Sequence, residues 1–178
     1  FSWRLGTFNE EAYIFSIVIY CAEIFGIITT LLHLFMTWNL TVRRSPPILE
    51  NRTVDVFVPT YNESVDMLRR TLISAKGMRY NCKIWLLDDG NRIEMRQLAS
   101  ELNVEYLTRQ DNMHAKAGNL NNALDQSNGE FIAIFDCDHA PHMNFITNTI
   151  GHFRDDSVAL VQTPQDLYNL DSYQHRKT

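Results

Sequence analysis

The stretch that decides the fold is Ile132-Ala-Ile-Phe-Asp-Cys-Asp-His139, in which an apolar run over residues 131–135 ends in two carboxylates. Side chains alternate along a strand, so Asp136 and Asp138 should point the same way while Cys137 packs into the core. Two neighbouring carboxylates repel each other unless a cation lies between them, and oxygen ligands favour Mg²⁺ or Mn²⁺. Because such a metal keeps positions open for substrate phosphates, the stretch predicts an enzyme that acts on a phosphate-containing substrate.

The composition is that of an ordinary globular chain with an acidic balance. The chain has 178 residues and a formal net charge of −5, which suits one domain with or without an appendage. We expect no nucleic-acid partner, because there is no basic stripe with interleaved aromatic residues. Cys21, Cys82 and Cys137 lie far apart without metal-ligand or disulfide spacing, which predicts free thiols in a reducing compartment. The first residue is Phe1 rather than Met, so we expect part of a longer protein.

Residues 13–38 are nearly all apolar and long enough for a transmembrane helix, which needs about 20 such residues. Tyr13 and Trp38 stand at the two ends, where aromatic belts meet the membrane–water interface. The alternative, a buried helix of a soluble protein, is disfavoured because the run is apolar around the whole helix. Glu23 is the one charge inside the run, and we expect it to face neighbouring helices, since a carboxylate exposed to lipid is costly.

Charges on either side of this apolar run predict its orientation. Arg43, Arg44 and Arg52 follow the run, whereas Arg4 stands against two glutamates before it. By the positive-inside rule, the C-terminal side is cytoplasmic. The expected division is a membrane segment over residues 1–44, a linker stiffened by prolines over 45–53 and a soluble domain over 54–178.

From residue 54 onward, strand and helix patterns alternate. Strands are expected over residues 54–58, 83–87, 104–107, 130–135 and 158–161. Helices are expected over residues 64–76, 92–102, 115–126 and 143–153. This alternation implies parallel βαβ units in a layered α/β sheet with helices on both faces. Ligands bind such sheets at the carboxyl ends of the strands, where three polar clusters lie, at residues 59–63, 88–90 and 136–138.

Each polar cluster also has a purely structural interpretation. Asn62 could cap the following helix, Asp89-Gly90 could form a turn, and His114 could stand beside a helix cap. A dinucleotide-binding dehydrogenase is disfavoured, because no Gly-x-Gly-x-x-Gly follows the first strand.

Taken together, the clusters resemble the motifs of the family 2 glycosyltransferases, and within them those of the cellulose synthases. The matching motifs are Val58-Pro-Thr-Tyr-Asn-Glu63, Leu87-Asp-Asp-Gly90, His114-Ala-Lys-Ala-Gly-Asn119, Asp136-Cys-Asp-His139 and Gln162-Thr-Pro164. The resemblance extends from Ala22-Glu23 in the apolar run to Pro164. It implies a GT-A-type fold, which is a layered, mostly parallel sheet with helices on both faces, preceded here by a transmembrane helix.

The resemblance also implies a role for each motif. The nucleotide-sugar site would comprise Thr60, Tyr61, Glu63, Asp89, His114, Lys116, Asn119 and Asp136. In that site Lys116 would reach the diphosphate, and Asp136 and Asp138 would bind the Mg²⁺ or Mn²⁺ that bridges it. A cation and a lysine would stabilise the negative charge that gathers on the leaving diphosphate.

Two features depart from the cellulose synthase pattern. The segment after Gln162-Thr-Pro164 usually continues with His and later a Pro, whereas Gln165 stands here. The Thr-Glu-Asp motif that carries the catalytic base and the acceptor-binding Gln-x-x-Arg-Trp motif do not occur in these residues. We therefore expect no catalytic residue in this chain and no turnover by it alone, with the general base lying downstream.

The resemblance implies the donor-binding part of a membrane-anchored, processive, inverting β-glycosyltransferase that transfers glucose from UDP-glucose to a growing polysaccharide. Two alternatives stay open: a synthase of a β-1,3- or mixed-linkage glucan, and a non-catalytic module that binds a sugar nucleotide. The expected partners are a UDP-sugar, a polysaccharide acceptor, the lipid bilayer and further synthase subunits. The expected location is the inner (plasma) membrane, with a multi-pass parent protein and a cytoplasmic catalytic domain.

Overall fold

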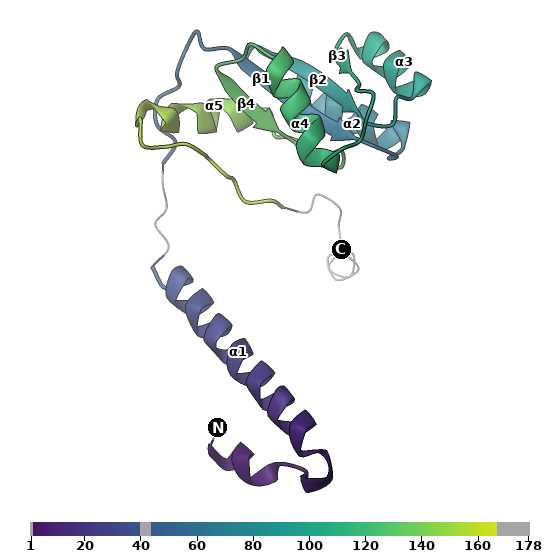
Figure 1. Cartoon of the computed structure of the whole chain (residues 1–178). Helices are drawn as coiled ribbons and strands as arrows, with labels where there is room; N and C mark the ends of the chain where they lie inside the picture. The colour runs from purple at the N-terminus through teal and green to yellow at the C-terminus, as the bar shows by residue number, and fades with distance from the viewer. Residues whose placement is uncertain (1, 40–43, 167–178) are drawn as a thin grey trace, which may run out of the picture. The chain divides into compact units, whose positions relative to one another are not determined.

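The computed structural model describes residues 2–39 and 44–166 of the chain (Figure 1). The chain divides into two compact units, Phe1–Arg44 and Ser45–Thr178. Arg43 and the segment 167–178, on which part of the sequence analysis rests, lie outside the described residues.

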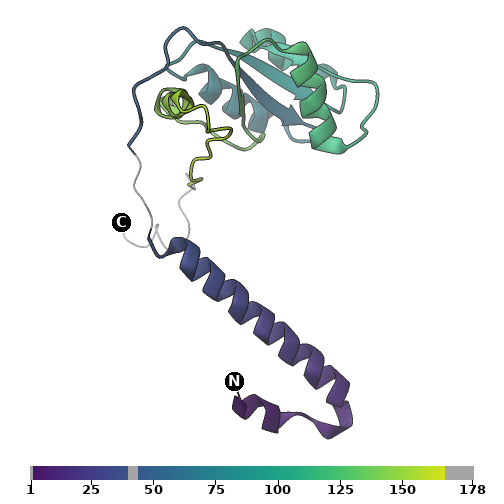
Figure 2. The ribbon, with the colours of Figure 1, turned by 60° about the vertical axis from the view of Figure 1, so that its left-hand side comes forward.

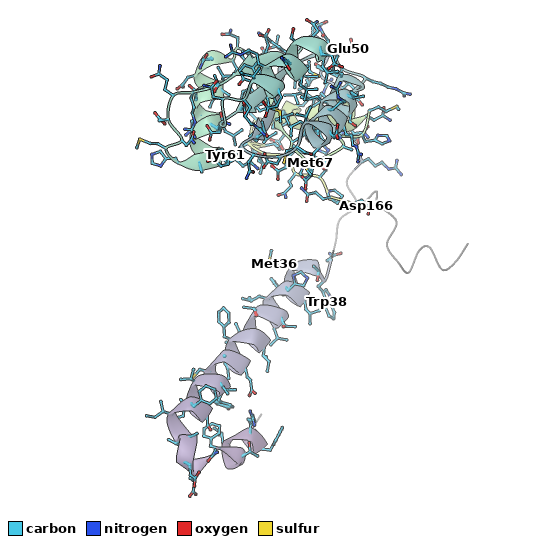
Figure 3. All side chains as sticks on the ribbon, turned by 90° about the vertical axis from the view of Figure 1, so that its right-hand side faces the viewer. Met36, Trp38, Glu50, Tyr61, Met67 and Asp166 are labelled. Atoms are coloured by element: carbon cyan, nitrogen blue, oxygen red, sulfur yellow. The ribbon has the colours of Figure 1, made fainter. Side chains whose placement is uncertain are left out.

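The first unit consists of two short 3-10 helices, η1 (Ser2–Thr7) and η2 (Glu10–Ala12), and the long helix α1 (Tyr13–Thr37). At 25 residues, α1 is about 37 Å long. Its apolar side chains project on all sides (Figure 3), none of its residues is buried, and Glu10–Thr37 is long and apolar enough to cross a membrane. Glu23, expected to face neighbouring helices, pairs with Arg4 of the short helix η1, whose guanidinium lies 3.1 Å from the carboxylate.

The second unit is built on a four-stranded sheet in the order β3-β2-β1-β4. The strands are β1 (Val54–Thr60), β2 (Cys82–Asp88), β3 (Glu105–Leu107) and β4 (Phe131–Ile134). All three strand pairings in the described part of the chain are parallel, as the alternation of strands and helices predicts.

Helices cover both faces of this sheet (Figures 1 and 2). They are α2 (Val65–Lys76), α3 (Ile93–Leu102), α4 (Ala115–Gln126), α5 (Phe145–Thr149) and the 3-10 helix η3 (Ile150–Arg154). Alternate residues of β1 pack in the two layers. Val54, Val56 and Val58 pack with residues of α2, α3 and α5, whereas Phe57 packs with Trp85 of β2 and Ala123 of α4. β1 is buried along its whole length, which explains its nearly continuous apolar sequence.

The structure differs from the sequence analysis at three places, one of them the alternative that Asn62 caps a helix. Ser64, not Asn62, caps α2, because its hydroxyl accepts the backbone N–H of Met67 at 3.3 Å. Residues 158–161 form no strand, because no neighbouring strand among the described residues pairs with them; Leu160 is 80% exposed. The helix expected over residues 143–153 is shorter, and after α5 it tightens into η3.

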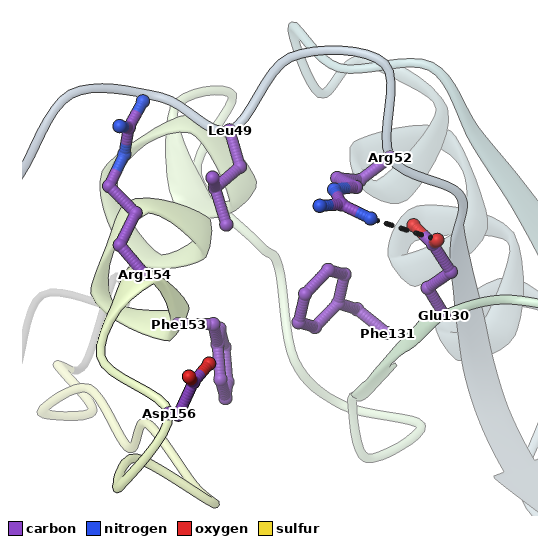
Figure 4. Close-up of a pocket in the computed structure, with 7 residues that line it drawn as sticks. All are labelled: Leu49, Arg52, Glu130, Phe131, Phe153, Arg154 and Asp156. Atoms are coloured by element: carbon purple, nitrogen blue, oxygen red, sulfur yellow. Dashed lines mark hydrogen bonds and ion pairs between the residues drawn. The ribbon is translucent and has the colours of Figure 1, made fainter.

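The proline segment before β1 packs against η3 within the second unit. Arg154 donates from Nε to the carbonyl of Pro47 at 3.2 Å and from Nη2 to that of Ile48 at 3.1 Å. Gly151 permits this approach, because a Cβ there would lie 2.5 Å from the Pro47 carbonyl oxygen. Beside this contact, near the starts of β1 and β4, a cavity of about 470 Å³ is lined by Leu49, Arg52, Glu130, Phe131, Phe153, Arg154 and Asp156 (Figure 4).

Candidate functional site

A second cavity, of about 590 Å³, opens at the carboxyl ends of β1, β2 and β4 and beside the first turn of α4. It is lined by Pro59, Thr60, Tyr61, Glu63, Asp89, Asn112, Ala115, Lys116, Asn119, Asp136, Cys137 and Asp138. All but one of the site residues predicted from the sequence are therefore brought together. The exception is His114, which is exposed, stands at the N-cap of α4 and makes no side-chain capping bond.

The adjacent carboxylates of Asp88 and Asp89 have different surroundings. Asp88 is completely buried and accepts the Arg92 backbone N–H at 2.6 Å, the Arg92 Nε at 3.1 Å and the Tyr106 hydroxyl at 2.9 Å. Burial and this contact with Asp88 raise the pKa of Tyr106, which keeps its hydroxyl protonated. Asp89 lines the cavity and forms a two-pronged ion pair with Arg109, in which Nη2 lies 2.7 Å from Oδ2.

Thr60, Tyr61 and Glu63 form one hydrogen-bonded group after β1. Glu63 accepts the Thr60 hydroxyl at 2.7 Å and the Tyr61 backbone N–H at 2.8 Å. Burial by itself raises the pKa of Glu63, but the hydrogen bonds outweigh it and the net pKa is lowered, so the carboxylate is ionised at neutral pH. Tyr61, labelled in Figure 3, is 55% exposed and lines the cavity, which leaves its ring accessible to a ligand.

Lys116 and Asp136 form an ion pair across the cavity, with side chains 52% and 44% exposed. Asp136, Asp138 and His139 each offer a ligand atom, and these atoms lie within 4.8 Å of one another. Two carboxylates and an imidazole suit a divalent cation such as Mn²⁺ or Mg²⁺. Sequence reasoning quoted His139 in a motif but gave it no role; its position directly after the Asp-x-Asp pair was the available signal.

The strand alternation expected at this site holds only in part. β4 ends at Ile134, so Asp136 and Asp138 lie in the turn that follows rather than in the strand. Cys137 packs against the core, as expected, but it also lines the cavity. Burial, and to a lesser degree the nearby Glu63, raises the pKa of the Cys137 thiol to about 11.

Asn119 is buried in the wall of the cavity. Its Nδ2 donates to the Leu87 carbonyl at 3.0 Å, which joins α4 to β2, while its Oδ1 is buried without a hydrogen-bond partner. Arg109, which sequence reasoning missed, lies behind Asp89. The sequence feature that could have indicated Arg109 is its position just after the third expected strand, at the edge of the sheet where the acidic clusters lie.

Comparisons with known proteins agree with the motifs. Residues 55–178 match the sequence pattern of glycosyl transferase family 2. Cellulose synthase 2 of Novacetimonas hansenii is 38% identical over 186 residues, which covers 97% of this chain and 12% of that protein. The cellulose synthase catalytic subunit (UDP-forming) of Pseudomonas fluorescens is 36% identical, over 97% of this chain and 25% of that protein. The chain therefore spans a quarter or less of the length of these relatives.

Solved structures share the fold of the chain at low sequence identity. A mannosyltransferase from Pyrobaculum calidifontis, in complex with GDP-Man and Mn²⁺, has a TM-score of 0.60 at 20% identity and covers 80% of this chain and 44% of its own. S. aureus TarS 1-349 has a TM-score of 0.51 at 22% identity, over 64% of this chain and 38% of its own. Both likenesses concern the GT-A-like arrangement of parallel sheet and flanking helices. With its sequence pattern matched over most of its length, the chain belongs to glycosyl transferase family 2.

Proposed function

We propose that this chain is the donor-binding part of a membrane-anchored, processive, inverting β-glycosyltransferase that transfers glucose from UDP-glucose to a growing polysaccharide, as in cellulose synthesis. The observation that carries the proposal is one cavity at the carboxyl edge of the sheet in which a lysine and the Asp-x-Asp pair meet Glu63 and Asp89. The similarity to the cellulose synthase catalytic subunit (UDP-forming) supports a uridine nucleotide as the donor.

We divide the cavity into a uridine end and a diphosphate end, because its lining residues suit the two halves of UDP. At one end, the exposed ring of Tyr61 can stack on a base, and the carboxylates of Glu63 and Asp89 can accept its N–H or a ribose hydroxyl. At the other end, the Lys116 ammonium can pair with the diphosphate. Uridine binding is thus assigned to residues after β1 and β2, and diphosphate binding to the start of α4.

Asp136 and Asp138, together with His139, would hold Mg²⁺ or Mn²⁺ next to Lys116. A bound divalent cation supplies charge stabilisation for a leaving diphosphate. Lys116 supplies a second positive charge at the same end of the cavity, and its pairing with Asp136 keeps its ammonium there before a donor arrives. We assign no general base to the residues that line the cavity and place the deprotonation of the acceptor hydroxyl elsewhere in the complete protein.

The proposed division keeps residues 1–44 as a membrane segment, 45–53 as a linker and 54–178 as part of the catalytic domain. Helix α1 would cross the plasma membrane, and the catalytic unit would lie in the cytoplasm, where arginines follow the apolar run. In the complete protein further spans, a polysaccharide acceptor and further synthase subunits would complete the assembly.

A second candidate is a synthase of another glucan, with β-1,3 or mixed linkages. The observation that favours it is Gln165, which stands where cellulose synthases usually carry His and whose Nε2 lies 3.1 Å from His139 Nε2. A different side chain beside the proposed metal site alters the surroundings of the reacting sugar. The two candidates share the donor and differ in the product.

The deciding experiment incubates the complete protein in membranes with radiolabelled UDP-glucose and determines the linkage of the product. Insoluble β-1,4-glucan is expected, whereas β-1,3 bonds would select the second candidate. Asp136→Asn and Asp138→Asn should remove the increase in UDP affinity caused by Mg²⁺ or Mn²⁺. Asp156→Asn, in the other cavity, is the matched control and should leave it unchanged. UDP affinity that is the same with EDTA as with the cation, or no transfer from UDP-glucose, would refute the proposal.

A further inference from the structure

Arg109 joins two parts of the molecule that both contribute to the lining of the proposed donor cavity, Asp89 and the loop that contains Ala115. On one side it holds Asp89, at the end of β2, by a two-pronged ion pair. On the other side, Nη1 donates to the Met113 carbonyl at 2.7 Å and Nη2 to the Ala115 carbonyl at 2.9 Å. The side chain is only 10% exposed. One guanidinium therefore fixes both the carboxylate and the loop that enters α4.

This loop has a backbone conformation that needs external support. His114 and Ala115 are consecutive and both have positive φ, at 60° and 44°. Such a conformation is strained for a non-glycine residue, and it persists only where the surroundings determine it. The carbonyls that Arg109 holds belong to the residue before this pair and to its second member. Arg109 is thus placed to maintain the left-handed turn.

The sequence of α4 leaves room for this contact. A Cβ at Gly118 would lie 2.5 Å from Arg109 Nη1 and closer still to the Met113 carbonyl oxygen. A residue with a side chain at position 118 would have to displace the guanidinium, the loop or both. Gly118 and Arg109 therefore act on the same loop from different elements.

Arg109 is poorly placed to bind the donor directly. Its Nε, both N–H groups of Nη2 and one of Nη1 are directed to protein oxygens, and Asp111 Oδ1 lies 3.7 Å from Nη1. It is also not among the residues that line the cavity. Its effect on a ligand must then pass through the residues that it holds, which are Asp89 and the loop that precedes Lys116.

We propose that Arg109 is a positioning residue that couples the uridine end of the cavity, through Asp89, to the diphosphate end, through the backbone that places Lys116. This inference rests on the proposed function, because it assumes that the cavity binds UDP. Arg109 sets the distance between the uridine end and the diphosphate end of the cavity, so that a nucleoside and its diphosphate are recognised together. A nucleoside alone, which does not reach Lys116, depends less on this separation.

The test compares UDP with uridine as ligands of the complete protein, by calorimetry. Arg109→Lys keeps the charge but loses the planar fork, so the loop carbonyls lose their donors. We expect UDP affinity to fall about 30-fold, which is the order expected when a buried hydrogen-bonding group loses its partner, and uridine affinity to fall about threefold or less. Gly118→Ala, which keeps the arginine but crowds its guanidinium and the Met113 carbonyl, should lower the preference for UDP over uridine in the same way.

Two further variants separate positioning from a loss of folding. Lys116→Gln should weaken UDP binding in the unsubstituted protein but have little further effect in the Arg109→Lys background, because the lysine is already displaced. Arg69→Lys is the matched control: Arg69 forms the same kind of two-pronged pair, with Glu101 on the α2–α3 surface, and the change should leave both affinities unaltered.

The outcomes distinguish the two proposals. If the unsubstituted protein binds no UDP, the proposed function fails and this inference fails with it. If it binds UDP but Arg109→Lys weakens UDP and uridine by the same factor, or if Lys116→Gln adds its full effect in that background, only the positioning role is refuted. A thermal melting temperature measured for each variant identifies any variant that is unfolded. If Arg109→Lys is unfolded, the preference of Gly118→Ala for UDP over uridine tests the positioning role.

Discussion

Replacing Asp88 by Asn should destabilise the fold strongly, although the two side chains have nearly the same shape. Asp88 is completely buried and accepts hydrogen bonds at both oxygens, among them two from Arg92, whose side chain is 17% exposed. The substitution removes the charge that pairs with Arg92 and turns an NH₂ group toward hydrogen-bond donors. Breaking a buried ion pair from one side costs about 3–5 kcal/mol, and the partial exposure of Arg92 favours the lower figure.

A loss of about 3 kcal/mol corresponds to a decrease of about 12 °C in the melting temperature, at about 4 °C per kcal/mol for a unit of this size. The measurement is thermal unfolding of the complete protein in detergent, followed by tryptophan fluorescence. Trp85 lies in β2 itself, 8% exposed, and reports on the sheet. Asp125→Asn, on the exposed surface of α4, is the control for the loss of one aspartate charge and should change the melting temperature by about 2 °C or less. A decrease for Asp88→Asn no larger than that of the control would refute the assigned role of this carboxylate.

Three smaller predictions follow from single side chains. Cys137, with a pKa raised to about 11, should be alkylated by iodoacetamide at pH 8 about 100-fold more slowly than glutathione, because less of it is thiolate. Equal alkylation rates, measured by peptide mass spectrometry, would contradict the burial of its thiol. Ser64→Ala should lower the free energy of unfolding by about 1 kcal/mol, because the Met67 N–H loses its hydrogen-bond acceptor. Ser64→Gly should lower it by only a few tenths, because glycine is also favoured at the N-cap position. Identical denaturant midpoints for the two variants would exclude the capping role. The pKa of Glu63 is lowered in the folded protein, so its stabilising effect is complete above the unfolded pKa of about 4.3 and is lost as the pH falls through the folded value. The stability difference from Glu63→Gln should therefore stay constant between pH 8 and pH 6, and a change in that window would show that Glu63 titrates near neutrality.

The buried strands could be predicted because a strand that is buried on both faces needs apolar residues that follow one another in the sequence. β1 and β2 are apolar nearly throughout, and Gly77 ends α2 where the pattern stops. The run at 158–161 looks equally strand-like, but a strand requires a partner, and periodicity contains no information about one. Asn62 and Ser64 are both good capping residues two positions apart, so composition alone could not select between them.

At the candidate site, the sequence indicated the lining residues but not how they are held. The resemblance implied that Lys116 and Asp136 act on the same diphosphate, and in the structure the two side chains form an ion pair. Nothing in the pair Asp88-Asp89 shows which carboxylate turns inward, since this depends on the positions of Arg92 and Arg109 in space. The left-handed turn at His114 and Ala115 could not be predicted either, because positive φ is uncommon even for His, which is enriched there, and alanine is not an enriched type.

The ion pairs of the two adjacent aspartates have a consequence for how fast a ligand can arrive. Arg92 and Arg109 each neutralise one of these carboxylates, so the remaining charges that line the cavity are those of Glu63, Asp136, Asp138 and Lys116. Three negative charges against one positive charge repel a free nucleoside diphosphate, whereas the same nucleotide that carries a divalent cation is repelled far less. The rate at which the nucleotide associates with the cavity should therefore depend on the cation, in addition to the affinity of the final complex. The association rate should rise with Mg²⁺ or Mn²⁺, because the nucleotide and the ion arrive together.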